Sequence, residues 1–263
     1  MNNLVDSFNR TEQVIAANFD YVFILTSMNK DYNPKRLDRY LASAWESGGM
    51  PVIVLTKSDT TDEAECFIDN TAENAIGVPV VAISSITGDG IDKLKALLKP
   101  KSTLVLLGSS GVGKSTLVNA LAGAELMKVK SIREDDSKGR HTTTHRQLLT
   151  LKDGTMIIDT PGMRELELWD VSSGLETAFS DIDELSKRCK FKDCTHTGEP
   201  GCAVAQALEE GTLSADRWDS YKKLKKGALY AASKENMNIL KQRKAKEKYI
   251  GKLQKELKKN PGK

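Results

Sequence analysis

The sequence has no apolar run long enough to span a membrane, and its polar opening lacks the plan of a signal peptide. We therefore expect a cytoplasmic protein that does not engage membranes. Cysteine is scarce, with four residues in 263, and three of the four lie close to a histidine. In a reducing compartment this grouping predicts a metal site rather than disulfides. The fourth, Cys66, is expected to be a buried apolar residue.

The net charge is small, at +3, but it is unevenly distributed. Residues 222–263 contain fifteen Lys or Arg against three Glu, a local charge of +12, which leaves −9 on residues 1–221. This split is typical of a basic arm that contacts a polyanion such as RNA, attached to an acidic body. A solvated helix or a weak coiled coil over residues 233–257 is the alternative.

Apolar runs and helix-type patterns alternate through the first two thirds of the chain. We expect strands over residues 21–26, 51–55, 78–83, 103–107, 147–151 and 155–158, and helices over 35–46, 63–76, 91–98 and 116–122. Further helices are expected over residues 203–209, 214–229 and 233–257. The first part therefore predicts a doubly wound α/β domain, whose ligands should lie beyond the carboxyl ends of the strands.

Residues 108–115 read Gly-x-x-x-x-Gly-Lys-Ser, between an expected strand and an expected helix. This spacing predicts a phosphate-binding loop in which Lys114 reaches the β- and γ-phosphates and the Ser115 hydroxyl ligates Mg²⁺. The candidate phosphate-binding residues are Gly108, Ser109, Ser110, Gly111, Val112, Gly113, Lys114, Ser115 and Thr116.

Three further motifs follow strand ends. The first is the base-binding candidate Thr56, Lys57, Ser58 and Asp59. Asp59 could accept hydrogen bonds from the N1–H and exocyclic amine of guanine, while the Lys57 stem covers the base. Ser84 and Ser85 could close over the base from the other side.

The third motif is Asp159-Thr-Pro-Gly162. Its carboxylate would hold Mg²⁺ through water, and the Gly162 N–H would meet the γ-phosphate. The joint occurrence at three strand ends predicts a GTP site. A general nucleoside triphosphatase, in which ATP competes with GTP, is an alternative against which Asp59 argues.

The base-binding motif precedes the phosphate loop, whereas Ras-like GTPases have the reverse order. Rotating the chain at residues 99–102 restores that order, so we predict a circularly permuted Ras-like P-loop GTPase domain. With its Thr56–Asp59, Gly108–Ser115, Gly139–Thr144 and Asp159–Gly162 motifs, the chain resembles the ribosome small-subunit-dependent GTPase A family (RsgA/YjeQ type) over residues 11–230. The resemblance implies a GTPase that acts on the small (30S) ribosomal subunit and its rRNA.

The histidine and three of the cysteines form the metal-site candidate Cys189, Cys194, His196 and Cys202. Three thiolates and one imidazole complete a tetrahedral zinc shell with no position for water, so the site should be structural. Chance clustering is the alternative, and Asp193 is a weaker ligand candidate. The resemblance implies the same ligand pattern in a mainly helical zinc-binding C-terminal domain.

The polar stretch before residue 147 resembles a first switch, in which Thr143 would ligate Mg²⁺ only when the γ-phosphate is bound; a threonine-rich lead into a strand is the alternative. Met163 stands where Ras-like enzymes place the water-orienting glutamine, so intrinsic hydrolysis should be slow. Similar permuted GTPases suggest that His141 replaces it, and a solvent-exposed histidine with no catalytic task is the alternative. The candidate catalytic residues are thus His141, Lys114 and Thr143.

We divide the chain into a linker remnant (1–18), a permuted GTPase domain (19–170) and a helical zinc-binding domain with a basic C-terminal helix (171–263). Family members carry an N-terminal oligonucleotide-binding barrel for which residues 1–20 are too few, so we expect a shortened form or a removed barrel. We expect a monomeric, slow GTPase that assists late maturation of the small subunit and is stimulated by it. The alternative is a zinc-stapled rRNA-binding module in which guanine nucleotide is only a conformational switch.

Overall fold

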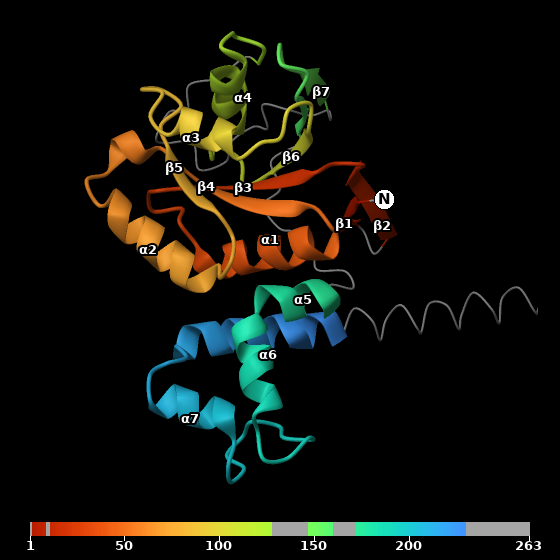
Figure 1. Cartoon of the computed structure of the whole chain (residues 1–263), viewed down its shortest axis with the longest axis vertical. Coiled ribbons are helices and arrows are strands. Elements are labelled where there is room, and N and C mark those ends of the chain that lie inside the picture. Colours follow the sequence, from red (N-terminus) through yellow and green to blue (C-terminus); the bar gives the residue numbers. More distant parts are fainter. Residues whose placement is uncertain (1, 9–10, 128–146, 160–171, 230–263) are drawn as a thin grey trace, which may run out of the picture.

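A six-stranded sheet forms the centre of the molecule (Figure 1). The computed structural model describes residues 2–8, 11–127, 147–159 and 172–229. The strand order is β5-β4-β3-β6-β8-β7, with β7 as the antiparallel edge strand. The strands are β3 (Tyr21–Ser27), β4 (Met50–Thr56), β5 (Val80–Ile83), β6 (Thr103–Leu107), β7 (Gln147–Thr150) and β8 (Met156–Asp159). Strands β3 and β6 are buried along their whole length, because apolar side chains point to both covered faces.

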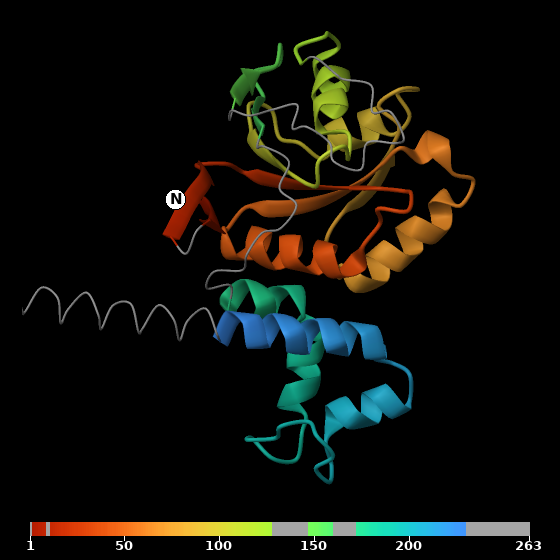
Figure 2. The ribbon, with the colours of Figure 1, turned by 180° about the vertical axis from the view of Figure 1, so that it is seen from behind.

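Helices cover both faces of this sheet (Figures 1 and 2). On one face lie α1 (Pro34–Glu46) and α2 (Ala64–Asn74), and on the other lie α3 (Ile91–Ala96) and α4 (Lys114–Ala122). Alternate residues of β3 supply the two cores, since Ile24 packs in the α1 cluster and Phe23 in the α4 cluster. The predicted doubly wound α/β fold is therefore confirmed, with element boundaries moved by up to a few residues.

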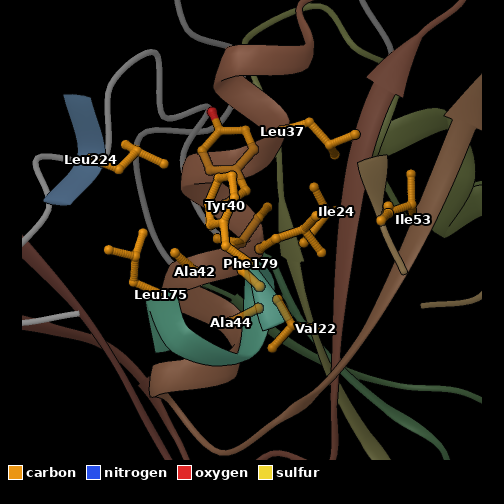
Figure 3. Packing of buried hydrophobic residues seen from close by; sticks show 14 of the residues in the cluster. Val22, Ile24, Leu37, Tyr40, Ala42, Ala44, Ile53, Leu175, Phe179 and Leu224 are labelled. Carbon is orange, nitrogen blue, oxygen red and sulfur yellow. The ribbon is translucent and has the colours of Figure 1, made fainter. Parts of the chain in front are cut away.

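A third layer, made of C-terminal helices, packs on the outer side of α1 (Figures 1 and 2). It contains α5 (Ser172–Ala178), α6 (Ser180–Lys187), α7 (Ala203–Glu209) and a helix over residues 215–229. Figure 3 shows Leu175 and Phe179 of this layer against α1, opposite Val22 and Ile24 of the sheet. Because α1 is covered on two sides, even its Asp38 is buried.

Three features differ from the sequence-based expectation. Residues 1–18 were expected to be a linker, but β1 (Asn3–Phe8) and β2 (Thr11–Ala17) form an antiparallel hairpin. We did not anticipate α5 and α6. Cys66 is exposed, so its predicted burial is wrong: on α2 the helical repeat turns Thr71 and Ala75 inward, which leaves position 66 on the solvent side.

Several predictions fall outside the described residues. They concern the helix over residues 233–257, the first switch with His141 and Thr143, and Gly162. The domain boundaries themselves remain a prediction. None of the helices among the described residues combines the length and hydropathy that a membrane span requires.

Candidate functional site

The base-binding motif and the phosphate loop meet at one edge of the sheet. Strands β4 and β6 both pair with β3 in parallel, so their carboxyl ends lie at the same edge of the sheet, one on each side of β3. The Thr56 hydroxyl, at the end of β4, donates a 2.7 Å hydrogen bond to the Val112 carbonyl in the phosphate loop. Thr56 is only 2% exposed, so this bond is shielded from water. The two motifs, separated in the sequence, are therefore in direct contact.

The backbone of the phosphate loop needs glycine at defined positions. Gly113 has φ +103°, a conformation that residues with a side chain rarely adopt, and it directly precedes the first residue of α4. A Cβ on Gly108 would lie 2.8 Å from the Leu25 carbonyl oxygen. The loop can therefore turn its amides toward the start of α4, where a phosphate would also meet the positive end of the helix.

Lys114 lies folded into this loop. It is 8% exposed, and its Nζ donates to the carbonyl oxygens of Gly108 (2.7 Å) and Ser109 (2.9 Å). Burial lowers the pKa of Lys114 from 10.5 to about 8, and the nearby Asp159 carboxylate opposes this shift. Asp159 compensates the charge of the buried Lys114 ammonium group only in part. Phosphate oxygens would supply the remaining negative charge.

Asp159 and Ser115 provide oxygen donors beside Lys114. Asp159 ends β8 and pairs in register with Leu106 of β6, one residue before the end of that strand. Its side chain is buried, while Ser115 is half-buried in the first turn of α4. A carboxylate and a hydroxyl are the hard ligands that Mg²⁺ prefers, so these residues fit the metal that accompanies nucleotide in GTPases.

The base-binding motif has an unusual backbone. Lys57 adopts the left-handed conformation, with φ +62°, and a 3₁₀ turn over Ser58–Thr60 follows. The Thr60 amide and hydroxyl both donate to the Lys57 carbonyl, at 3.0 and 2.8 Å. Lys57 and Ser58 are half-buried and Asp59 is exposed. The turn leaves Asp59 exposed, so a bound base could reach its carboxylate.

Ser84 and Ser85 follow β5, which pairs with β4 so that Ile83 lies opposite Thr56. Ser84 is fully buried, and its Oγ accepts hydrogen bonds from the amides of Ile86 (3.3 Å) and Thr87 (3.1 Å). Its side chain therefore shapes the loop, and the half-buried Ser85 is the better candidate to meet a base.

The structure brings the four predicted metal ligands together. Ligand atoms of Cys189, Cys194, His196 and Cys202 all lie within 4.8 Å of one another. The Cys189 and Cys202 sulfurs are 3.9 Å apart, and His196 Nδ1 lies 3.5 and 3.4 Å from them. A tetrahedral zinc shell would give about 3.8 Å between sulfurs and about 3.6 Å between sulfur and nitrogen. These three separations fit a zinc shell, and the Cys₃His group could hold a metal ion.

A second layer of contacts fixes the orientation of His196. Its Nε2 lies 3.3 Å from the Ser186 hydroxyl, which itself donates to the Ile182 carbonyl at 2.9 Å. The hydroxyl oxygen is thus available to accept from Nε2–H, which leaves Nδ1 deprotonated and facing the thiols. Burial, with a contribution from Lys225, lowers the pKa of His196 and favours the neutral ligand form. Sequence reasoning missed Ser186, because nothing in its spacing marks it.

The comparisons with known proteins agree with this geometry. The model of the RsgA GTPase family matches residues 1–169. A protein of Listeria innocua named small ribosomal subunit biogenesis GTPase RsgA 1 is 52% identical, covering 92% of this chain and 70% of the relative. A Methanosarcina acetivorans protein named small ribosomal subunit biogenesis GTPase RsgA is 46% identical, covering 90% of this chain and 64% of the relative.

Two solved structures also resemble this chain. The crystal structure of YjeQ from Thermotoga maritima superposes with a TM-score of 0.62 at 29% identity, covering 85% of this chain and 75% of that protein. The structure of YloQ, described as a circularly permuted GTPase, gives 0.59 at 27% identity, with 85% and 71% coverage. The predicted fold class and family are therefore confirmed: this chain belongs to the RsgA GTPase family and is a GTP-hydrolysing enzyme with a circularly permuted GTPase domain.

Proposed function

We propose that this chain is a slow GTPase that binds the small ribosomal subunit, assists its late maturation and is stimulated by it. The observation that carries the nucleotide part is the Thr56 to Val112 hydrogen bond, which unites the base-binding motif with the phosphate loop. The names of relatives support the ribosomal part, because proteins 46% and 52% identical are called small ribosomal subunit biogenesis GTPases.

Each motif then has a defined task in the proposed cycle. Lys57 and Asp59 hold the guanine base, and Lys114 exchanges its two carbonyl partners for the β- and γ-phosphates. Ser115, Thr143 and, through water, Asp159 would hold Mg²⁺, and the bound ion would supply positive charge beside the phosphates. The Gly162 N–H contacts the γ-phosphate, and His141 orients the attacking water. Because Met163 can neither donate nor accept usefully, the intrinsic rate is low.

Zinc in the Cys₃His group would connect α6 to α7. Cys189 follows α6 and Cys202 is the N-cap of α7, where its sulfur accepts from the Ala205 amide at 3.3 Å. A closed four-ligand shell leaves no position for a substrate, so the ion would act structurally. The exposed lysines of the adjacent helix, at positions 222, 223, 225 and 226, extend from this layer as a surface for rRNA phosphate.

GTP turnover should be measured with and without purified small subunits. Stimulation supports the proposal. Unchanged turnover, together with nucleotide-dependent binding to the subunit, would favour the zinc-stapled rRNA-binding module instead. ATP competition for GTP binding tests the base assignment. No competition is expected, because adenine does not offer the N1–H and exocyclic amine arrangement of guanine from which Asp59 would accept hydrogen bonds.

The water-orienting role is tested by His141→Ala. We expect this variant to bind GTP normally and to lose most of its hydrolysis, while His145→Ala, in the same segment, keeps it. Normal turnover in His141→Ala would remove His141 from the mechanism without affecting the nucleotide site.

A further inference from the structure

Arg217 is the most deeply buried cation in the C-terminal layer among the described residues. Its side chain is 5% exposed and lies 4.6 Å above the Phe179 ring centroid. It pairs with Asp181 through two hydrogen bonds of 2.7 Å, from Nε and Nη2. A buried arginine with this fork geometry is held in one orientation, because both bonds must be made together.

The same guanidinium also reaches two helix ends. Nη1 donates to the carbonyl of Asn74 (2.8 Å), the last residue of α2, and Nη2 donates to the carbonyl of Ala178 (3.0 Å), the last residue of α5. Carbonyls in the last turn of a helix have no partner within the helix and carry its negative end. Arg217 thus caps a helix of the GTPase domain and a helix of the C-terminal layer with one group.

The residues that follow Asn74 lead directly to the base-binding edge. Ala75 is buried, and its carbonyl accepts from the Val78 amide at 3.0 Å. The Pro79 carbonyl then accepts from Ile53 of β4 at 2.9 Å, and β5 ends immediately before Ser84. The connection between α2 and the serine loop is therefore short and hydrogen-bonded, with little freedom to absorb a displacement of α2.

Contacts around Arg217 fix the helix over residues 215–229 against α1 as well. Ser220 hydrogen-bonds the buried carboxyl of Asp38, whose pKa is raised by burial while Ser220 and Arg217 oppose the rise. Lys35 forms an ion pair with Asp216 at 3.3 Å, but both side chains are exposed. The exposed pair contributes little, so the buried Ser220 to Asp38 contact is the main polar link between this helix and α1. The Arg217 contacts link the same helix to α2, α5 and α6.

We propose that Arg217 is a positioning residue for guanine binding, acting through the α2 carboxyl end and β5 on the loop of Ser84 and Ser85. This inference rests on the proposed assignment of that loop and of Asp59 to the base. It implies that a partner which displaces the helix over residues 215–229 changes guanine affinity, and that nucleotide binding changes affinity for the partner by the same factor.

The test compares GDP and ADP affinities in the full chain by equilibrium titration, at a temperature where melting curves show every variant folded. Arg217→Lys keeps the charge but loses the fork and the two caps. We expect its preference for GDP over ADP to fall by about three- to tenfold. Lys35→Gln, which removes only the exposed ion pair across the same interface, should keep the wild-type preference.

Asp181→Asn separates positioning from simple stabilisation. It weakens the ion pair but leaves the Asn74 carbonyl within reach of Arg217, so it should lower the melting temperature while retaining the preference for GDP. If Arg217→Lys is folded and keeps the wild-type preference, the positioning role is overturned. If the wild-type chain itself does not prefer GDP, the proposed base assignment fails instead, and the two failures are distinguishable.

Discussion

Lys114 should make the stability of the nucleotide-free protein rise with pH in the alkaline range. In the unfolded chain its amine has the ordinary pKa of 10.5, and in the folded chain burial lowers the pKa to about 8. Between these values the unfolded chain binds more protons, so raising the pH favours the folded state. At 1.36 kcal/mol per pKa unit, the free energy of unfolding should gain about 2 kcal/mol between about pH 7 and pH 9.5 from this group.

The assay is thermal unfolding of nucleotide-free wild type and Lys114→Met across that pH range. Other groups titrate in both proteins, so the difference between the two profiles isolates Lys114. We expect wild type to gain about 4 to 8 °C relative to the variant from neutral to alkaline pH. Saturating GDP should abolish the gain in wild type, since bound phosphate restores the charged amine. Parallel profiles without nucleotide would refute the argument that burial depresses this pKa.

Three further changes test other parts of the structure. Thr56→Val leaves a buried carbonyl of the phosphate loop without its donor, which should cost about 1–3 kcal/mol and weaken GDP binding in titrations, whereas Thr56→Ser should bind normally. Cys194→Ser should lose the zinc detected by elemental analysis and lower the melting temperature, whereas Asp193→Asn should retain both. Gly174→Ala places a Cβ 2.1 Å from a carbonyl oxygen of α1 and should destabilise the protein by about 1–3 kcal/mol in denaturant titration. Gly227→Ala, with nothing within 4 Å of its Cβ, should not destabilise it.

The parts of the fold that could be predicted are those whose signals are local. The buried strands appear in the sequence as apolar runs bounded by turn residues, and the phosphate loop is fixed by glycine and lysine spacing. The Cys₃His group could be predicted because its four ligands lie close together in the sequence. The convergence of the phosphate loop and the base-binding motif in space followed from strand order, since carboxyl ends of parallel strands share an edge.

The remaining parts depend on contacts between distant residues. Helix α5 spans only seven residues and contains Gly174, so its intrinsic propensity is poor. It is stabilised by packing on α1, where the Gly174 amide also donates to a Glu46 carboxylate oxygen at 2.7 Å. The roles of Ser84 and Arg217 were equally hidden, because each is defined by partners that the sequence does not identify.

The central place of β3 should allow this enzyme to be assembled from two fragments. It pairs with β4 on one side and β6 on the other, and these neighbours come from opposite sides of the exposed turn at Lys101. A cut there would yield two polypeptides, one with the base pocket and the other with the phosphate cradle. Reassembled fragments would hold a single nucleotide between two chains. The nucleotide would then stabilise the association of the fragments, and its removal would weaken that association.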